Sequence, residues 1–374
     1  MAYMKDSTGR RLDSFRVREY LPVMDTAVLG DSIDADSTGW WPTACGLTEQ
    51  RMRLLYNGGV GGDTTAMALA RIANVIYQAP KVCIIGGGVT NDIAQGVAAA
   101  TTKANLTSMV TQLRAAGITP LFRNCPPRGA AVAPYDTDAL AIEAVNAHNT
   151  WLAGYAASEG IELFDIYTPL VDPTTSLIKA ALTNDGIHPN LTGALVVGRA
   201  FRDNLPNVFK NAEPFPLNTR NTFTRIQNPL FITHTSGVAT NWANGSGFTT
   251  KDINTPAPAG NWQHFAKTDS AWALATQTPG IPGGTPITIG YRISVAAGLG
   301  VISYRFKDAA GTAIGNWVSS THKVLSTTAD GLVHIIRALA PANAASMDLY
   351  IENQRDGAGP AVDFSVAQFT IVAG

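Results

Sequence analysis

The chain has 374 residues, of which 45% are hydrophobic and 15% are charged, and its formal net charge is -1. These proportions are those of a globular protein with a sizeable core, and the length suits two domains. The near-neutral charge, without a basic block, gives no indication of binding to nucleic acid or to an acidic membrane surface. No run approaches the roughly 20 apolar residues of a membrane span, and the amino terminus lacks the apolar stretch of a secretory signal, so we expect a soluble protein.

Three cysteines, Cys45, Cys83 and Cys125, are scattered along the chain. They are too few for a disulfide framework, and none forms a CxxC pair that would indicate a metal site. Cys83 lies in an apolar run, which favours a buried thiol over a reactive one.

The first half of the chain, residues 22–207, alternates short apolar runs with longer helical patterns. Five runs rich in Val, Ile, Leu or Phe predict buried strands, and they read TAVLG, RMRLLYNGG, KVCIIGGG, ITPLFRN and IELFDI. Helices are predicted over residues 64–78, 98–116, 137–158 and 192–204. The alternation predicts an α/β domain with a parallel sheet, helices on both faces and ligands at the carboxyl ends of the strands.

The pattern changes after Pro206. Residues 208–220 are rich in Pro, Asn and Thr and predict a linker, and residues 1–21 form an amino-terminal extension. Residues 221–374 show short alternating segments separated by turn residues such as those at 308–311, which predicts an all-β antiparallel sandwich domain. In the segment ITIGYRISV, one face of the predicted strand carries Ile287, Ile289, Tyr291, Ile293 and Val295.

Two polar turns follow the first two predicted strands. Gly30-Asp31-Ser32 follows the first, and a serine at a strand-to-helix turn can expose its hydroxyl group. Residues 57–64, after the second, contain four glycines in five positions, which allow a tight backbone turn. The Gly62 amide, at the start of the next helix, can therefore face an anionic oxygen. A phosphate-binding loop does not fit, because the segment lacks a Gly-Lys-Ser/Thr ending and GxGxxG spacing.

Two further polar groups lie at predicted strand ends. Asn91 follows the third strand and the glycines at 86–88, and its side-chain amide is a neutral donor that suits a developing negative charge. Asp185 and His188 precede the last predicted helix. Imidazole is well suited to accept a serine proton near neutral pH, and a carboxylate three residues earlier can hold its other ring nitrogen. The alternative for each residue is an ordinary turn or helix cap.

Taken together and in this order, these motifs resemble those of the SGNH (GDSL-type) serine hydrolases over about residues 22–205. The resemblance implies a flavodoxin-like three-layer α/β/α sandwich and an esterase activity. It also implies that Ser32 is the nucleophile, His188 the general base and Asp185 its orienting acid.

By the same resemblance the oxyanion hole consists of the backbone amides of Ser32 and Gly62 and the side chain of Asn91. The sequence departs from the family at one point, because two residues rather than the usual one separate Gly88 from Asn91. No cofactor is implied. No metal is expected either, because no second histidine or cysteine lies at ligand spacing from His188.

Other chemically capable residues have structural interpretations. His148 shares a helix face with apolar residues, which indicates the core. Trp40 and Trp41 follow the serine turn and either line a substrate pocket or cap the core. Arg123 and Arg128 flank two prolines after the fourth strand, where an anionic substrate is one hypothesis for their partner.

The predicted β-sandwich contains candidates for sugar stacking, since aromatic rings pack on the apolar faces of sugars. They are Trp242, Trp262, Trp272 and Trp317, although tryptophan is also common in sandwich cores. The remaining histidines, at positions 234, 264, 322 and 334, show no metal-binding spacing.

We therefore predict a carboxylester hydrolase that deacetylates an esterified polysaccharide or similar glycan. The glycan rests only on the appended β-domain. The alternatives are a non-catalytic glycan-binding or structural module with a spent hydrolase domain, and a lipase or thioesterase for longer acyl chains. The opening MKDSTGRRLDSF also weakly resembles the starts of phage tail proteins, which would make the protein a virion component; the oligomeric state stays open.

Overall fold

The structure is a computed structural model that describes residues 24–36, 39–128, 138–210, 212, 227, 230–232, 234–235, 238–242, 248, 250–254, 257, 260–269, 274–323, 331–353 and 361–373. The predicted extension, residues 1–21, lies outside the described residues, as does most of the predicted linker, residues 208–220. The domain boundaries therefore stay predictions. Within the described residues, no helix is both long and apolar enough to cross a membrane.

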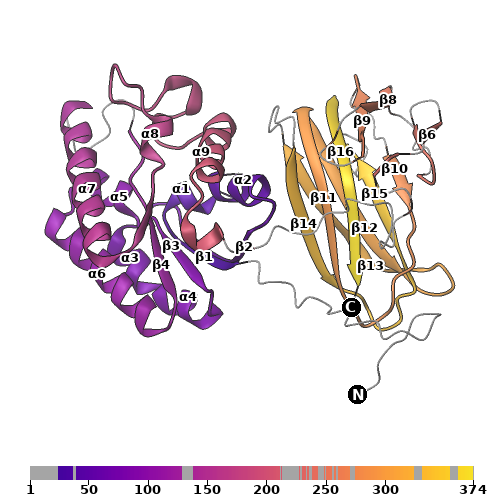
Figure 1. The fold of residues 1–374 in the computed structure, drawn as a ribbon, viewed down its shortest axis with the longest axis horizontal. Helices are drawn as coiled ribbons and strands as arrows, with labels where there is room; N and C mark the ends of the chain where they lie inside the picture. Colours follow the sequence, from indigo (N-terminus) through magenta and orange to yellow (C-terminus); the bar gives the residue numbers. More distant parts are fainter. Residues whose placement is uncertain are drawn as a thin grey trace, which may run out of the picture.

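The first part of the chain forms a five-stranded parallel sheet in the order β2-β1-β3-β4-β5 (Figure 1). The strands are β1 (Met24–Gly30), β2 (Met52–Gly59), β3 (Val82–Ile85), β4 (Thr119–Arg123) and β5 (Glu162–Phe164). Each overlaps one of the predicted apolar runs, so these five predictions are confirmed. The strand order is that of a flavodoxin-like sheet, and it reverses direction between β1 and β3. Ligands bind at the carboxyl ends of the strands beside such a reversal.

Alternate side chains of the central strands enter two separate cores. On β1, Ala27 and Leu29 join one core and Val28 joins the other, as expected of a strand buried on both faces. Each core is closed by helices, which Figure 1 shows on both sides of the sheet. The predicted three-layer α/β/α sandwich is therefore confirmed.

The helices agree with the prediction where the pattern is long. The first core is covered by α3 (Thr65–Ala70), α4 (Ile72–Gln78), α5 (Val89–Ala94), α6 (Ala99–Ala115) and α7 (Asp138–Glu159). The second is covered by α1 (Ser32–Ala35), α2 (Trp40–Leu47), α8 (Tyr167–Leu170), η1 (Ala180–Leu182), α9 (Leu191–Asp203) and α10 (Asn207–Lys210). The predicted helix over 64–78 is divided at Arg71, which belongs to neither α3 nor α4.

The second part of the chain is all β. One sheet has the order β10-β15-β12-β13, a second has β14-β11-β16-β9-β8, and β6 pairs with β7. The strands are β6 (His234–Thr235), β7 (Val238–Ala239), β8 (Thr250–Asn254), β9 (Trp262–Lys267), β10 (Leu274–Gln277), β11 (Pro286–Ala297), β12 (Leu299–Lys307), β13 (Ala313–Lys323), β14 (Leu332–Leu339), β15 (Ser346–Glu352) and β16 (Val362–Ala373). Every pair in these sheets is antiparallel, as predicted.

The alternating apolar residues of β11 face the core, as predicted. Its five alternating apolar residues all lie in the core between the two sheets and are at most 2% exposed. The predicted turn at 308–311 joins β12 to β13, where the Asp308 carboxylate accepts hydrogen bonds from the amides of Ala310 and Thr312. Gly311 takes a left-handed conformation with φ of 81°. The antiparallel sandwich is therefore confirmed, with its register set by period-2 burial.

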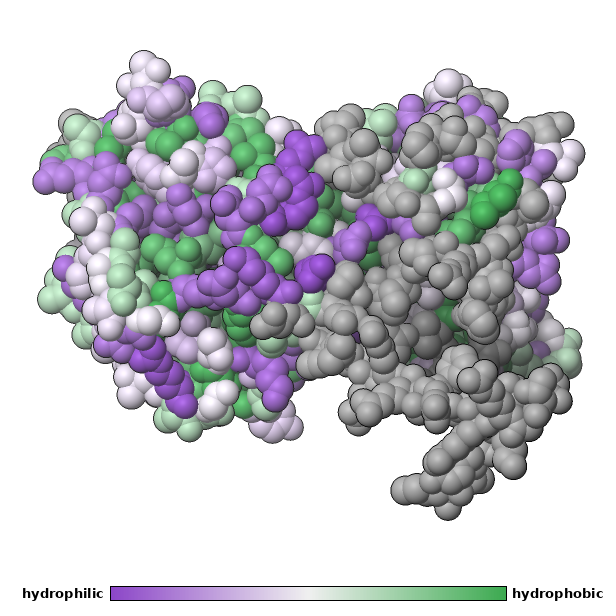
Figure 2. Space-filling view, in the orientation of Figure 1, coloured by the Kyte–Doolittle hydropathy of each residue, from purple (hydrophilic) through white to green (hydrophobic). Residues whose placement is uncertain are grey.

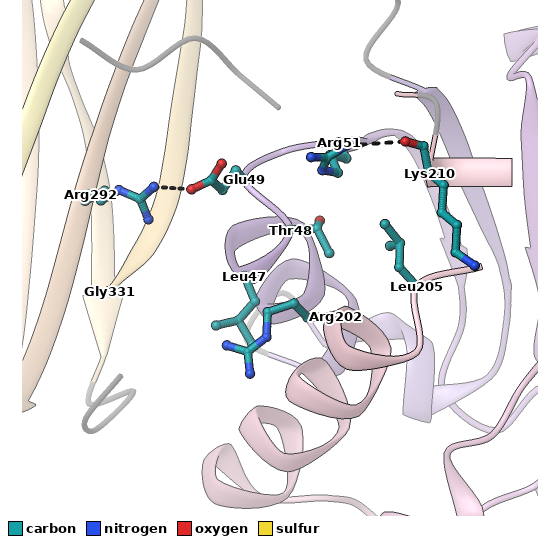
Figure 3. A pocket seen from close by; sticks show the side chains of 9 residues that line it. All are labelled: Leu47, Thr48, Glu49, Arg51, Arg202, Leu205, Lys210, Arg292 and Gly331. Carbon is teal, nitrogen blue, oxygen red and sulfur yellow. Dashed lines mark hydrogen bonds and ion pairs between the residues drawn. The ribbon is translucent and has the colours of Figure 1, made fainter. Parts of the chain in front are cut away.

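The two parts meet at the turn between α2 and β2. Gln50 Nε2 donates to the carbonyl oxygen of Val333 on β14 at 2.7 Å, and Glu49 forms an ion pair with Arg292 on β11 (Figure 3). Glu49 and Gln50 have φ of 54° and 62°, a left-handed backbone conformation that residues other than glycine adopt only at a cost in free energy. Leu47, Leu195 and Leu332 form a small apolar cluster beside them.

A cavity of about 510 Å³ lies at this joint, lined by Leu47, Thr48, Glu49, Arg51, Arg202, Leu205, Lys210, Arg292 and Gly331 (Figure 3). Figure 2 shows hydrophilic residues gathered where the α/β part borders the β part. The cations there have partners. Arg51 donates to the carbonyl oxygens of Lys210 and Ala212, and Arg202 pairs with Asp203. The cavity contains none of the predicted catalytic residues.

Candidate active site

Ser32 lies where β1 turns into α1. Asp31 is the N-cap of α1, and its Oδ1 accepts a hydrogen bond from the Ile33 amide at 2.9 Å. The preceding Gly30 has no room for a side chain, because a Cβ there would lie 1.8 Å from Asp34 Oδ2. The tight turn ends the strand at once and leaves Ser32 half-buried at the carboxyl end of the sheet.

His188 lies in a turn that its own sequence holds together. Asp185 Oδ1 accepts hydrogen bonds from the amides of Ile187 and His188, at 2.9 and 2.8 Å. Thr183 Oγ1 donates to the His188 carbonyl oxygen at 2.8 Å, and Gly186 takes the left-handed conformation that the turn requires. An aspartate that caps its own turn in this way is common in loops. Here it also fixes the backbone that carries the imidazole.

The two turns, 156 residues apart in the sequence, meet at one edge of the sheet. His188 Nε2 lies 2.7 Å from Ser32 Oγ, and His188 Nδ1 lies 2.5 Å from Asp185 Oδ2. Burial acts to raise the pKa of Asp185, but hydrogen bonds from the His188 ring and from backbone amides outweigh it and lower that pKa below its ordinary value. A charged carboxylate on Nδ1 leaves Nε2 free to accept the serine proton, which is the arrangement of a nucleophile with its base.

The turns after β2 and β3 come to the same edge. Asn91 Nδ2 donates to the Asp63 carbonyl oxygen at 2.9 Å, which ties α5 to the glycine turn. Gly88 takes φ of 82° and approaches so closely that a Cβ would lie 2.5 Å from that same oxygen. A Cβ on Gly61 would lie 4.0 Å from Ser32 Cβ, and Gly62, with φ of 82°, faces open space. The two residues after Gly88 form the first turn of α5 and place Asn91 beside the glycine turn.

Residues 28–196 match the profile of the GDSL-like lipase/acylhydrolase family. This part of the chain is a GDSL-like acylhydrolase domain. These residues therefore form a carboxylic ester hydrolase domain of that family, and residues 28–196 are called the acylhydrolase domain below.

Solved structures resemble parts of the chain. A Bacteroides fragilis protein assigned as an acylhydrolase is 25% identical with a TM-score of 0.43, covering 52% of this chain and 98% of its own. A GDSL-like lipase of Bacteroides thetaiotaomicron is 22% identical with a TM-score of 0.42, covering 49% and 90%. The enzymatically active domain of tailspike protein 4 of bacteriophage CBA120 is 14% identical with a TM-score of 0.34, covering 40% and 21%. No match was found among the curated proteins.

Two side chains that the sequence does not indicate hold together the turns of the candidate site. Arg71 forms an ion pair with Asp63 and donates to the Gly58 carbonyl oxygen at 2.8 Å, so it holds the glycine turn at both ends. Asp92 is buried and accepts hydrogen bonds from the Thr65 amide and from the hydroxyl groups of Thr65 and Thr102. It therefore joins α5, which carries Asn91, to α3 and α6. The only sequence signal for Asp92 was its place beside Asn91.

Arg123 and Arg128 lie in the interior rather than at a substrate surface. Arg123 is 1% exposed and pairs with Asp31 and Asp34, whereas Arg128 is 3% exposed and donates to the Thr90 carbonyl oxygen at 2.9 Å. The structure gives both guanidinium groups protein partners, so it lends no support to the hypothesis of an anionic substrate at these residues.

Trp40, Trp41 and His148 are held within the protein by burial or by hydrogen bonds. Trp40 is 1% exposed in the core, and its Nε1 donates to Asp34 Oδ1 at 3.0 Å. Trp41 Nε1 donates to the Asp34 carbonyl oxygen at 2.8 Å. His148 is buried as predicted, and burial, with Lys103 and Arg123 nearby, lowers its pKa to about 4.

Of the four tryptophans of the β part, Trp242 and Trp262 are buried and Trp272 lies outside the described residues. Trp317 is half-buried on β13. The Arg305 guanidinium lies 4.5 Å over its ring, and the Tyr350 ring centroid is 4.2 Å away. Among the described tryptophans of the β part, Trp317 is the one exposed enough to suit contact with a sugar.

Proposed function

We propose that the acylhydrolase domain hydrolyses esters with Ser32 as the nucleophile, His188 as the general base and Asp185 as its orienting acid. The observation that carries this proposal is the pair of contacts that His188 makes, 2.7 Å to Ser32 Oγ and 2.5 Å to Asp185 Oδ2. Ser32 Oγ attacks the ester carbonyl carbon while its proton passes to His188 Nε2. The imidazolium then gives that proton to the departing alcohol oxygen as the ester bond breaks. Water next attacks the acyl-enzyme, returns a proton through His188 and releases the acid.

The proposed oxyanion hole is formed by the amides of Ser32 and Gly62 and by Asn91 Nδ2. The side-chain amide nitrogen of Asn91 carries two hydrogens. The Asp63 carbonyl oxygen accepts one of them, so the other remains for the oxyanion. Gly62 is exposed, with open space where a Cβ would lie, so a carbonyl oxygen has room to approach this residue. Removal of one such donor typically lowers kcat by about 10²–10³.

The substrate class that fits this site best is a short acyl ester on a bulky glycan. The His188 and Asp185 side chains are 43% and 51% exposed, so within the described residues the site opens to the surface. A surface site can meet an ester carried by a polymer, whereas a long acyl chain needs an apolar channel to leave water. The appended β part and its Trp317 supply a further surface for a polysaccharide.

Ser32→Ala tests the proposal. We expect it to abolish release of p-nitrophenol from p-nitrophenyl acetate, with Ser158→Ala, an exposed serine of α7, retaining wild-type turnover. Full activity in Ser32→Ala contradicts the assignment of the nucleophile.

A chain-length series from acetate to octanoate and a screen of acetylated glycans test the substrate. The glycan proposal predicts that acetate is preferred and that a polymer releases acetate. A preference for octanoate favours instead the alternative of a lipase or thioesterase.

A further inference from the structure

A buried ionic cluster lies directly beneath the Ser32 turn, formed by Arg123, Asp31 and Asp34, and the proposed chemistry does not use it. Arg123, at the carboxyl end of β4, is 1% exposed, and both carboxylates are 0% exposed. Arg123 Nε donates to Asp34 Oδ1 at 2.8 Å and Nη2 to Asp34 Oδ2 at 2.5 Å, a two-pronged contact. The same Nη2 lies 3.3 Å from Asp31 Oδ1. One guanidinium thus joins β4 to the residues on both sides of Ser32.

The surrounding residues fit closely around this cluster. A Cβ on Gly86, the residue after β3, would lie 2.3 Å from Asp34 Oδ2 and 2.4 Å from the Arg123 guanidinium, so only glycine fits at this position without a shift of the cluster. Trp40 Nε1 donates to the Asp34 carboxylate, and Trp41 Nε1 to its carbonyl oxygen. Both the carboxylate and the backbone carbonyl oxygen of Asp34 are therefore held by hydrogen bonds.

The cluster is a poor device for stability alone. Buried ion pairs can often be replaced by apolar side chains without loss of stability, because desolvation offsets their attraction. Here one cation faces two buried carboxylates, and Asp31 Oδ2 has no hydrogen-bond partner within the described part of the chain. Burial raises the pKa of Asp31 to about 6 even though Arg123 opposes the rise. Such an unfavourable arrangement is expected at functional sites rather than in an ordinary core.

We infer that Arg123 is a positioning residue of the active site, which acts through Asp34 and Asp31 to hold the Ser32 hydroxyl and amide in register with His188. The inference rests on the proposed role of Ser32. Asp31 caps α1 on one side of the nucleophile and Asp34 lies two residues after it, so a shift of either moves Ser32. Small misplacements of a reacting group lower the rate by up to about 10².

The test is a charge-free version of the cluster, Arg123→Met with Asp31→Asn and Asp34→Asn. The two introduced amides keep acceptors for the Ile33 amide and for Trp40, and no buried charge is left without its partner. We therefore expect the melting temperature to stay within a few degrees of wild type. We expect kcat to fall about 10–100-fold with KM within about twofold, because positioning acts on the chemical step. The rate of inactivation by a fluorophosphonate should fall by a similar factor.

The matched control is Arg114→Met with Glu159→Gln, which removes an exposed pair of the same kind. Its kcat and its inactivation rate should both equal those of wild type.

The outcomes separate this inference from the proposed function. If Ser32→Ala is inactive but the folded triple variant has wild-type kcat and inactivation rate, Arg123 is purely structural and the inference is wrong. If Ser32→Ala retains activity, the proposed function itself is wrong. Should the triple variant fail to fold, the kcat of Arg123→Lys tests the inference instead. This substitution keeps the charge but lacks the planar fork, so wild-type kcat in that folded variant also overturns the inference.

Discussion

Asp185 does two things with its two carboxylate oxygens. Oδ1 accepts hydrogen bonds from the backbone amides that shape the turn, and Oδ2 lies 2.5 Å from His188 Nδ1. The residue therefore holds the loop and, in the proposed mechanism, also orients the base. This double use could be predicted from spacing, since an aspartate in a turn caps amides two and three residues later. The partner at Ser32 could be predicted only from the order of motifs, because the contact spans 156 residues.

Asp185→Asn should separate the two uses. The substituted amide keeps an acceptor for the turn, so we expect the thermal melt to change little, while kcat/KM falls by about 10²–10⁴ because a neutral group no longer stabilises the imidazolium. Steady-state kinetics on p-nitrophenyl acetate measure this, with the exposed Asp203→Asn as control. Activity within a few fold of wild type would argue against Asp185 as the orienting acid.

Asp31→Asn should change how stability depends on pH. The pKa of Asp31 is raised from 3.8 to about 6 in the folded protein, first by burial, so between these values the folded state holds a proton that the unfolded chain releases. Wild-type stability therefore gains from this proton below about pH 4 and loses that gain as pH rises to about 6. The introduced amide keeps the cap on Ile33 but does not titrate. The melting temperature of the variant, relative to that of wild type, should therefore rise from about pH 4 to 7. A constant difference across that range contradicts the raised pKa.

At the scale of elements, buried strands and long helices were predictable because their burial repeats with a regular period. β1 and β3 are short apolar runs, and α6 and α7 are long helical patterns with left-handed Gly117 and Gly160 just after them. The short helix α2, which reads WWPTACGL, was not predicted, because it is only 8 residues long and its tryptophans are held by Asp34 rather than by a periodic face. The partners of Arg71 and Arg123 could not be predicted in this way, because no periodic pattern indicates them. For Arg123 the hypothesis was an anionic substrate, whereas its partners are Asp34 and Asp31, 89 and 92 residues away.

Two glycine-to-alanine changes make a matched pair at this scale. Gly86→Ala forces a methyl group against Asp34 and Arg123, so we expect a loss of about 1–3 kcal/mol from overpacking and a lower kcat as the Ser32 turn shifts. Gly154 lies exposed within α7 with no atom near its missing Cβ, so Gly154→Ala should gain about 0.5–1 kcal/mol of helix stability and leave kcat unchanged. Denaturant unfolding and turnover measure both. Equal effects of the two changes would mean that the packing around Gly86 does not constrain the cluster.

At the scale of the molecule, the acylhydrolase domain and the β part are joined by side chains on a strained turn. Glu49 and Gln50 both hold left-handed backbone while they reach Arg292 and Val333, and strain of this kind persists only where surrounding contacts fix it. The turn follows directly on α2, whose Trp40 contacts Asp34. The joint and the Ser32 turn are therefore linked by one short helix.

Glu49→Gln measures the strength of this joint. The Glu49 and Glu159 side chains are equally exposed, at 41% and 40%, but their partners differ, because Arg292 is 8% exposed and Arg114 is 42% exposed. Because only 8% of the Arg292 side chain is exposed, water replaces a lost charged acceptor less readily there than at Arg114. Glu49→Gln should therefore lower stability by about 1–3 kcal/mol. Glu159→Gln should cost less than about 1 kcal/mol, since water replaces its contact with Arg114. Calorimetry of the full chain distinguishes the two, and a cost no larger for Glu49 than for Glu159 would mean that the ion pair contributes little to holding the domains together.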